Sequence, residues 1–572
     1  MKVLLVHPED TPKDLAPGSW DKIIDLGWSP ASTYEQWTAQ FHCPVETLHK
    51  YHHAQQELDF FFRVAAAGKH LTDKENINWW ELFLLFYCME RMEVISRLQC
   101  MTDSLGGDVH FFVTRACFEA DVVKRWRKVH IVRSPSKLRK LRHFVGEIDA
   151  LPLWELRQIF WDKYDPAFAV RRRFMRKRSG AAMPVILVPS TYVNSSKTAI
   201  NFASKLPEKN FLLVTTRVSG ELKETPGNVQ TTKLGAYACS RGFQSECMRI
   251  VEAWDVMRRK LADDPDMAIL DSLSLVMGFP KFLECGLGIR DAWGHLLDQE
   301  SVEAVLSCDN NPFMLLPVLL AKRRNIPTVS SHHGALDWRY RILPPHADVV
   351  LAKGRMEQDY LVRVCGVPPE KVEMGAPVIP EATFAMNEAQ SRDSIVFFSE
   401  AYEAHGARAD EIYKEILVPL ANLAFKAGRQ LVIKLHPFEN AKRRRKLAYA
   451  IVPATMHSIL HVIAGPLTPA LLGRTWFGVT VLSTVAMECT AAGIPCFLCE
   501  WLEYPHHGYG DQFRRYGAGY TLHTADEVSD IPKKIESKPV GSLIDDLWQA
   551  IPERELEQLF TSDRNLSLAA YS

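Results

Sequence analysis

The chain has 572 residues, which is too long for one hydrophobic core and indicates a multidomain globular protein. Lys and Arg number 68, as do Asp and Glu, so no net positive field favours binding to nucleic acid. The 12 cysteines have no regular spacing, which is typical of free thiols in a reducing compartment, and we expect a cytoplasmic protein.

The apolar runs of the sequence are short. The first, at residues 3–6, is too short for a secretory signal. The runs at 79–88 and 313–321 fall well below the roughly 20 residues that cross a bilayer. We therefore expect no transmembrane helix.

Residues 1–180 are expected to form an N-terminal α/β region. Short β-branched or apolar runs alternate there with stretches of helical period, which is the pattern of parallel βαβ units. A helical stretch is predicted at 44–66, and a charged helical passage at about 136–178. The predicted strands of this region are 3–6, 23–26, 109–113 and 130–132.

A second, Rossmann-like unit is predicted at 181–380. It opens with a strand at 184–188, and Ser195 or Ser196 is expected to cap the helix that follows. The other predicted strands of this unit are 211–215, 267–270, 303–307, 327–330, 348–352 and 371–374.

A third unit is predicted at 394–530, after a linker. Residues 381–393 lack strand character, and a strand at 394–398 follows them. The tail, 531–572, is expected to be helical and to pack back on an earlier domain. The sequence thus predicts an α/β fold with mainly parallel sheets.

Residues 430–440, QLVIKLHPFEN, predict a buried strand whose end carries Lys434, His436 and Pro437. Parallel sheets bind ligands beyond the carboxyl ends of their strands, so a cation and an imidazole there are suited to a diphosphate. A strand that ends in an ordinary surface turn explains this motif equally well.

Residues 479–495, VTVLSTVAMECTAAGIP, predict a strand, then Ser483 and Thr484, then a helix that ends at Gly493. The helix N-terminus and the two hydroxyls would form an anion site at the same sheet edge. Glu488, one turn further on the same helix face, would reach a ribose diol. The alternative interpretation is a plain helix cap.

Four segments of the chain, in this order, resemble elements of one superfamily. They are SHHGALD (331–337), ADVVLAKGRMEQDYLVRVCGVPPEKVEMGAPVI (347–379), LVIKLHP (431–437) and VLSTVAMECTAAGIP (481–495). They are similar to the HG, HP and ST-E elements of GT-B glycosyltransferases that build bacterial surface polysaccharides. CDP-glycerol glycerophosphotransferases and capsule Kdo and sialic-acid transferases are among these enzymes. The resemblance covers roughly residues 300–525.

The resemblance implies two Rossmann-like domains that face a cleft, an acceptor domain at 181–380 and a nucleotide-sugar donor domain at 394–530. It implies inverting transfer of a sugar or polyol phosphate to a glycan or lipid-linked acceptor. His436 and Ser483 or Thr484 would then contact the donor phosphate, and Glu488 the ribose.

An inverting transferase needs a base for the acceptor hydroxyl, which favours a histidine. His333 is the first candidate because it follows the predicted strand at 327–330 and precedes Gly334, which permits close approach. The alternative is a histidine that only packs its own loop. Asp309 and Asp337 are the reserves, either as the base or as the carboxylate that orients the imidazole.

We expect no metal cofactor. Asp264 and Asp266 match the Asp-x-Asp pattern of metal-dependent transferases, but they precede the predicted strand at 267–270 rather than follow a strand, which indicates a turn. Lys434 and His436 would balance the diphosphate charge instead.

The loop at 190–196 and three basic clusters each have two interpretations. The loop binds the acceptor or is an ordinary capped turn. The clusters at 124–142, 171–178 and 442–446 are solvated faces or a surface for anionic lipid at the inner membrane face.

Two other functions remain open. An isomerase like UDP-GlcNAc 2-epimerase has the same two-domain fold, but its His-Arg-Arg-Glu-Asn element is replaced here by FFSEAYEAHG (397–406). A nucleotide-sugar-binding protein without catalysis would keep the donor motifs and lose the base.

Overall fold

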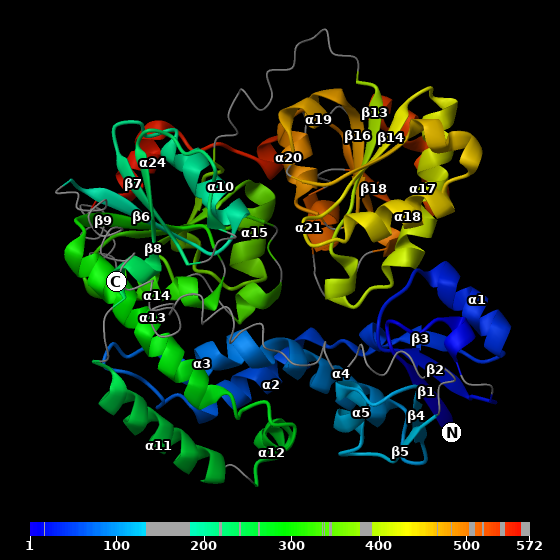
Figure 1. The fold of residues 1–572 in the computed structure, drawn as a ribbon, viewed down its shortest axis with the longest axis horizontal. Helices are drawn as coiled ribbons and strands as arrows, with labels where there is room; N and C mark the ends of the chain where they lie inside the picture. The colour runs from blue at the N-terminus through cyan, green and yellow to red at the C-terminus, as the bar shows by residue number, and fades with distance from the viewer. Residues whose placement is uncertain are drawn as a thin grey trace.

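Three parallel β-sheets, each flanked by helices, follow one another along the chain (Figure 1). This arrangement confirms the predicted α/β class. We call residues 1–132 the first domain, 183–377 the second and 392–537 the third. The computed structural model describes residues 1–15, 18–132, 183–216, 220–238, 242–260, 263–309, 311–334, 336, 338–342, 346–377, 392–465, 467–481, 483–502, 509–516, 520–537 and 544–561.

The first domain contains a five-stranded parallel sheet in the order β3-β2-β1-β4-β5. Its strands are β1 (Lys2–Val6), β2 (Lys22–Asp25), β3 (Val45–Thr47), β4 (His110–Val113) and β5 (Val129–Ile131). Its helices are α1 (Ala31–Phe41), α2 (Ala54–Ala67), α3 (Trp79–Phe83), α4 (Met89–Ser104) and α5 (Phe118–Val123), with a π-helical turn (Leu84–Cys88) between α3 and α4.

Strand β3 corrects the prediction of a helix over 44–66. Val45 pairs with Ile23 of β2, and α2 begins only at Ala54. A strand of three residues is too short to show a period of its own, so the helical period of the sequence around it hides β3. Pairing with β2 nevertheless makes these residues a strand.

The second domain contains a seven-stranded parallel sheet in the order β12-β11-β10-β9-β6-β7-β8. Its strands are β6 (Val185–Ser190), β7 (Asn210–Thr215), β8 (Val229–Lys233), β9 (Val302–Ser307), β10 (Thr328–Ser331), β11 (Val349–Ala352) and β12 (Val372–Met374). Its helices are α10 (Val193–Ala203), α11 (Gln244–Lys260), α12 (Pro265–Ser272), α13 (Phe279–Gln299), α14 (Leu315–Arg323) and α15 (Arg355–Arg363).

The predicted strand at 267–270 is wrong, because these residues belong to helix α12. Met267 and Leu270 are both buried, at the three-residue spacing that places side chains on one helix face. Asp264 caps the helix, since its Oδ1 accepts the Met267 N–H at 3.0 Å. A four-residue apolar run does not distinguish a strand from a buried helix.

The third domain contains a six-stranded parallel sheet in the order β15-β14-β13-β16-β17-β18. Its strands are β13 (Ser394–Phe398), β14 (Gln430–Lys434), β15 (Leu460–Ile463), β16 (Thr475–Thr480), β17 (Cys496–Cys499) and β18 (Tyr520–Leu522). Its helices are α17 (Ala409–Lys426), α18 (Ala441–Ile451), α19 (Pro469–Arg474), α20 (Val485–Ala491), α21 (Tyr509–Tyr516) and α22 (Ile531–Ser537). Most of the predicted linker, 381–393, lies outside the described residues.

The C-terminal tail returns to the second domain through α23 (Ile544–Leu547) and α24 (Glu553–Leu559). Leu556 and Phe560 are buried against the second sheet, where the ring of Phe560 lies 6.4 Å from that of Phe211. Figure 1 shows α24, in red, beside β7.

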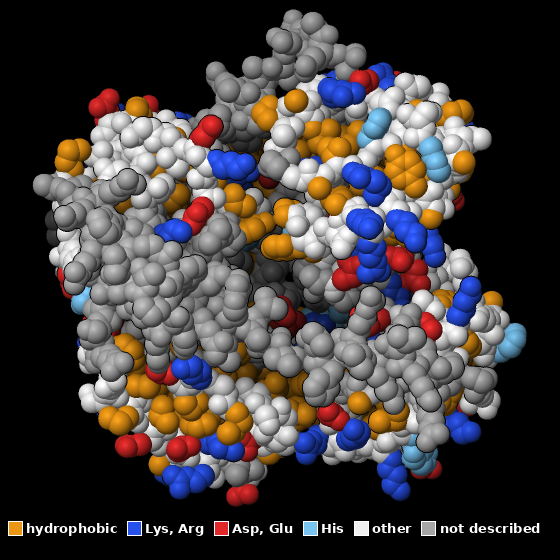
Figure 2. All heavy atoms as spheres, in the orientation of Figure 1, with side chains coloured by type: hydrophobic (Ala, Val, Ile, Leu, Met, Phe, Trp, Pro, Cys, Tyr) orange, Lys and Arg blue, Asp and Glu red, His pale blue; other side chains and the backbone are white. Residues whose placement is uncertain are grey.

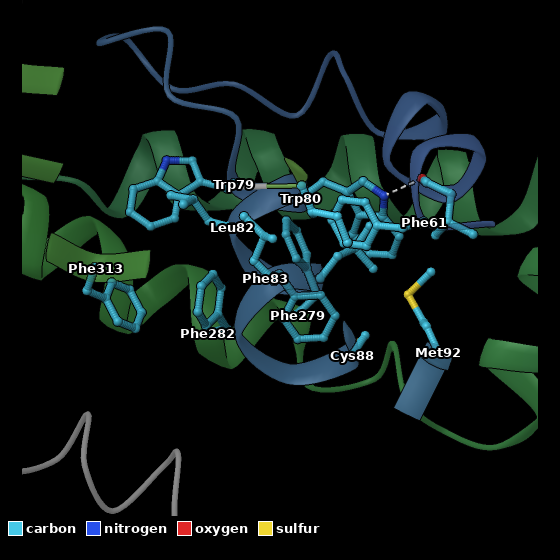
Figure 3. Close-up of a cluster of buried hydrophobic side chains, with 14 of the residues drawn as sticks. Phe61, Trp79, Trp80, Leu82, Phe83, Cys88, Met92, Phe279, Phe282 and Phe313 are labelled. Atoms are coloured by element: carbon cyan, nitrogen blue, oxygen red, sulfur yellow. Dashed lines mark hydrogen bonds between the residues drawn. The ribbon is translucent and has the colours of Figure 1, made fainter. Parts of the chain in front are cut away.

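The first and second domains share one hydrophobic core (Figure 3). Trp79 of α3 packs on α13, and a Cβ on Gly286 would lie 2.2 Å from its ring, so only glycine fits there. Beside this contact, the buried Arg290 of α13 pairs with Asp73 at 2.7 Å. The two domains are therefore one packed unit.

The first and third domains are joined by Arg408, which precedes α17. Its guanidinium makes two hydrogen bonds of 2.8 Å to the carboxylate of Asp25, at the end of β2, and lies over the ring of Trp37. It also donates to the carbonyls of His7 and Pro8, each at 2.9 Å. Arg408 thus fills the edge of the first sheet where a ligand of a parallel sheet would bind.

Candidate functional site

The strand β14 ends at Lys434, which is only 8% exposed. Its ammonium donates to the Leu435 carbonyl at 2.8 Å. Burial lowers the pKa of Lys434, Glu439 raises it, and the nearby charge of Lys197 lowers it again. Two cations in a partly desolvated place attract an anion more strongly than either would in water.

His436 and Pro437 form the turn that follows β14. The N–H of Phe438 donates to His436 Nδ1 at 3.3 Å, so the proton of the neutral ring is on Nε2, where it can bind a phosphate oxygen. The backbone N–H of His436 donates to Glu439 Oε2 at 2.9 Å. Arg444 of α18 holds Oε1 of the same carboxylate at 2.9 Å, which anchors the turn.

Ser483 and Thr484 precede α20, which is shorter than we expected. The helix has seven residues, Val485–Ala491, and the side chain of its N-cap residue Thr484 makes no capping bond. Ser483 Oγ accepts the Val485 N–H at 3.4 Å. A helix this short has only a small dipole, so its N-terminus attracts an anion weakly. The anion site therefore depends more on side chains, and less on the helix N-terminus, than the sequence indicated.

Glu488 lies on α20 and is partly exposed. Burial raises the pKa of its carboxyl, while the charges of Lys197 and Lys353 lower it. Within the described parts of the chain, its carboxylate makes no hydrogen bond. Its two oxygens are therefore available to accept bonds from a ligand diol.

Lys197 was not predicted. It is exposed on α10 of the second domain, yet its charge acts on Lys434 and Glu488 of the third. The two domains therefore face each other at this point. A single lysine within a helix belongs to no recognisable motif. Only its position directly after the predicted loop at 190–196 could have indicated a role.

The predicted base, His333, lies just beyond β10. Its Nδ1 is 3.1 Å from the Cys308 carbonyl, which can only accept, so Nδ1 carries the proton. Burial lowers the pKa of His333, and Asp309 partly opposes this effect. The neutral ring therefore presents an unprotonated Nε2, which has no hydrogen-bond partner among the residues described.

Asp309 acts on His333 through its charge. Its Oδ2 accepts the N–H and the hydroxyl of Thr191, at 2.8 and 2.6 Å, and its Oδ1 accepts the Asn311 N–H at 2.9 Å. These bonds fix the start of the 190–196 loop. Asp337, the other reserve, lies outside the described residues.

The prediction that Ser195 or Ser196 caps α10 is wrong. The helix begins at Val193, so both serines lie inside its first turn. Ser195 Oγ is 3.2 Å from His333 Nδ1, and Ser196 Oγ donates to the Gly220 carbonyl at 2.7 Å. The predicted loop at 190–196 is therefore mostly the end of β6 and the first turn of α10, and this turn contacts the candidate base.

The loops of the second and third domains meet. A Cβ placed on Gly334 would lie 3.5 Å from Thr484 Cγ2, which is ordinary van der Waals distance. The ring of Tyr192 lies 5.7 Å from that of His333 and 6.3 Å from that of Phe438. Figure 2 shows the molecule hollowed between these lobes. The structure therefore brings residues 332–334, which we call the histidine loop, beside Thr484 of the ST-E element.

Lys353 and the surroundings of His332 were also not predicted. Lys353 follows β11 and is 2% exposed. Burial and the charges of His333 and Lys353 lower the pKa of His332 well below 6.5. Lys353 lies inside one of the quoted segments, where no spacing rule separates it from other lysines.

No cluster of three or more His, Cys, Asp or Glu side chains suited to a metal ion occurs in the described ranges. Asp264 caps α12, as described above, which corrects the turn that we expected. The absence of a metal requirement stays a prediction.

Of the basic clusters, 442–446 lies on α18. Arg444 is buried and paired with Glu439, so the outward-facing cations of this cluster are Lys442, Arg443, Arg445 and Lys446. The cluster at 171–178 and part of that at 124–142 lie outside the described residues. No described helix is long and apolar enough to span a membrane. Contact with anionic lipid stays a prediction.

Comparisons with known proteins return structural likenesses alone. No family model and no curated protein matches the chain. Among solved structures it is similar to the wall teichoic acid polymerase TagF, with 9% identity over 76% of this chain and 100% of that one and a TM-score of 0.40. It is also similar to UDP-GlcNAc 2-epimerase from Neisseria meningitidis bound to UDP-GlcNAc, with 13% identity, coverage of 68% and 100% and a TM-score of 0.37.

A third similar structure is CalG4, the calicheamicin glycosyltransferase, with 12% identity, coverage of 68% of this chain and 97% of that one and a TM-score of 0.38. The likenesses thus include GT-B glycosyltransferases and epimerases.

Proposed function

We propose that this chain is an inverting glycosyltransferase that moves a sugar or polyol phosphate from a nucleotide-activated donor to a hydroxyl of a glycan or lipid-linked acceptor. One observation carries this proposal. A neutral His333, whose Nε2 has no hydrogen-bond partner among the described residues, lies on a loop that runs beside Thr484, near the cations and the carboxylate of the third domain.

The donor would bind mainly to the third domain. Lys434, Lys197 and the Nε2–H of His436 surround the phosphates with positive charge and hydrogen-bond donors. Glu488 accepts from the two ribose hydroxyls, since its carboxylate has no other hydrogen bond within the described ranges. Thr484 adds a hydroxyl at the same edge.

The transfer step would use His333 as a general base. Its Nε2 takes the proton of the acceptor hydroxyl while the acceptor oxygen attacks the transferred group from the side opposite the nucleotide. The bond to the nucleotide phosphate breaks, and the nucleotide leaves with the electron pair. Lys434, Lys197 and His436 stabilise the added negative charge by electrostatic preorganisation, without a metal ion.

A two-stage experiment tests this proposal. A thermal-shift screen against CMP, CDP, UDP and GDP identifies the nucleotide, since a ligand that binds the folded state raises the unfolding temperature. The matching labelled donor is then incubated with and without candidate acceptors. Acceptor-dependent transfer supports the proposal, whereas epimerised donor formed without an acceptor, or binding without any turnover, contradicts it.

A further inference from the structure

Lys353 is a buried cation at the carboxyl end of the second sheet, outside the donor-binding set. Its ammonium lies 2.9 Å from Oε1 of Glu357, and its backbone N–H donates to Oε2 of the same carboxylate. Both residues are nearly inaccessible, at 2% and 3% exposed. Burying a charge is costly unless it is paired and hydrogen-bonded, and the carboxylate of Glu357 provides that pairing for Lys353.

The second bond of the Lys353 ammonium points to the histidine loop. It donates to the Gly334 carbonyl at 3.0 Å, and Gly334 directly follows His333 in the chain. The same glycine lies beside Thr484 of the third domain. Lys353 therefore connects α15, through Glu357, to the point where the histidine loop meets the ST-E element.

We propose that Lys353 is a positioning residue: it fixes His333 beside Thr484 by holding the Gly334 carbonyl, while Glu357 holds the Lys353 ammonium. This inference rests on the proposed function, in which His333 acts on the acceptor. It concerns how the loop is held, and Lys353 itself contacts neither donor nor acceptor.

The charge of Lys353 also bears on the protonation of the loop. The charged and titratable groups that face His333 are His332, Asp309 and Lys353, and Tyr192 packs on its ring. Lys353 lowers the pKa of His333, whereas Asp309 raises it. Removing the ammonium should therefore raise the pKa of His333 and leave more of it protonated, and inactive as a base, near neutral pH.

Three variants separate position from charge. Lys353→Met removes both the hydrogen bonds and the charge, and Lys353→Arg keeps the charge but changes the donor geometry. Lys322→Met is the matched control, because Lys322 also pairs with a carboxylate of the second domain, Asp348 at 2.9 Å, and is 34% exposed. Thermal unfolding establishes that each variant is folded.

The first readout is the titration of the His333 ring by NMR in resting protein, with the signal assigned by His333→Gln. We expect Lys353→Met to raise the pKa of His333 by about one unit, at the low end for a neighbouring charge, and Lys322→Met to leave it unchanged. An unchanged titration in a folded Lys353→Met variant overturns the inference.

The second readout is turnover of the Lys353→Arg variant. It keeps the inference testable if Lys353→Met does not fold. Lys353→Arg should keep the wild-type titration and nucleotide affinity but lower kcat by at least about tenfold, because small displacements of a reacting group are costly. Wild-type kcat in this variant overturns the positioning role. A wild-type protein that shows no transfer with any donor overturns the proposed function instead, and the Lys353→Met titration then remains the test of the contact between Lys353 and the loop.

Discussion

Protonation at the candidate base depends on two local features, burial and the Nδ1 hydrogen bond. Burial lowers the pKa of His333, and the Cys308 carbonyl assigns the ring proton to Nδ1. A surface histidine with an ordinary pKa near 6.5 would be partly protonated at neutral pH, and the protonated fraction cannot accept a proton. The loop thus favours the chemistry before any substrate binds.

The pH dependence of turnover follows from the lowered pKa of His333. Because the pKa of His333 is lowered, the ring stays neutral at neutral pH, and kcat should be constant there and fall only as the pH drops below 6.5. A pH profile of single-turnover rates measures this limb. A half-maximal rate above pH 7 would contradict the assignment of His333 as a buried neutral base.

The donor-binding residues make a second prediction at this scale. His436→Ala, Thr484→Ala and Glu488→Ala should each weaken nucleotide binding by about 1.5 to 3 kcal/mol, because each removes a hydrogen bond to a charged partner. Calorimetry measures the affinity. His457→Ala is the control, since this histidine bonds the Val452 carbonyl within the same domain. Unchanged affinity in all three variants would exclude this edge as the nucleotide site.

The sequence identified the residues that stand in motifs and missed the isolated ones. His333, His436 and Glu488 follow strand ends or helix starts at recognisable spacings, and the structure brings their loops together. Lys197 and Lys353 become visible only when α10 and β11 are placed beside the third domain. Their role depends on tertiary packing, which no local spacing encodes.

At the scale of elements, α12 and α20 alter the arguments about charge. The Asp-x-Asp pair does not precede a strand, as the sequence predicts, because Asp264 caps helix α12. The helix dipole expected at Ser483 and Thr484 is small, since α20 has only seven residues. Phosphate binding therefore depends more on the side chains of Lys434, Lys197 and His436.

Because of the side chains of Lys434, Lys197 and His436, we predict that turnover needs no divalent metal. Transfer should persist in excess EDTA, because the three side chains provide the positive charge that a bound cation would otherwise supply. Asp264→Asn should also leave turnover unchanged, since an Asn at this position still caps α12. Loss of activity in EDTA, restored by Mg²⁺ or Mn²⁺, would mean that the phosphate site is misread.

At the scale of the whole molecule, the first domain connects the other two. It shares a core with the second domain through Trp79 and α13, and it holds the third through Arg408 and Asp25. Figure 1 shows its helices α2 and α3 beneath the green lobe, and its sheet with α1 and α5 beneath the yellow and orange one. We infer that it limits the relative motion of the two domains whose loops form the site.

Arg408→Ala tests this connection. It leaves the carboxylate of Asp25 buried without its cation, with only the Gly27 N–H and the Tyr34 hydroxyl as donors, which is expected to cost about 3 to 5 kcal/mol at the interface. Hydrogen exchange of residues 22–47 should rise, and adding Asp25→Asn should partly restore protection. Arg429→Ala, which removes a guanidinium lying over Trp476 within the third domain, is the control. Unchanged exchange in Arg408→Ala would show that this contact does not hold the interface.

The α/β class and most strands were predictable, because buried parallel strands have continuous apolar runs such as 394–398. The short edge strands β3 and β8 were not, since half-exposed residues such as 229–233 carry no such run. The packing of the first domain on both others was also missed. Arg408 and Trp79 are single residues whose partners lie hundreds of positions away in the chain.

The central claim is that His333 takes the proton of an acceptor hydroxyl during transfer from a nucleotide-activated donor. The most direct test is a single-turnover assay with saturating labelled donor, comparing wild type with His333→Gln. We predict that the variant binds nucleotide as tightly as wild type and transfers about a hundredfold to ten-thousandfold more slowly. Transfer at the wild-type rate, with nucleotide affinity also unchanged, would contradict the account.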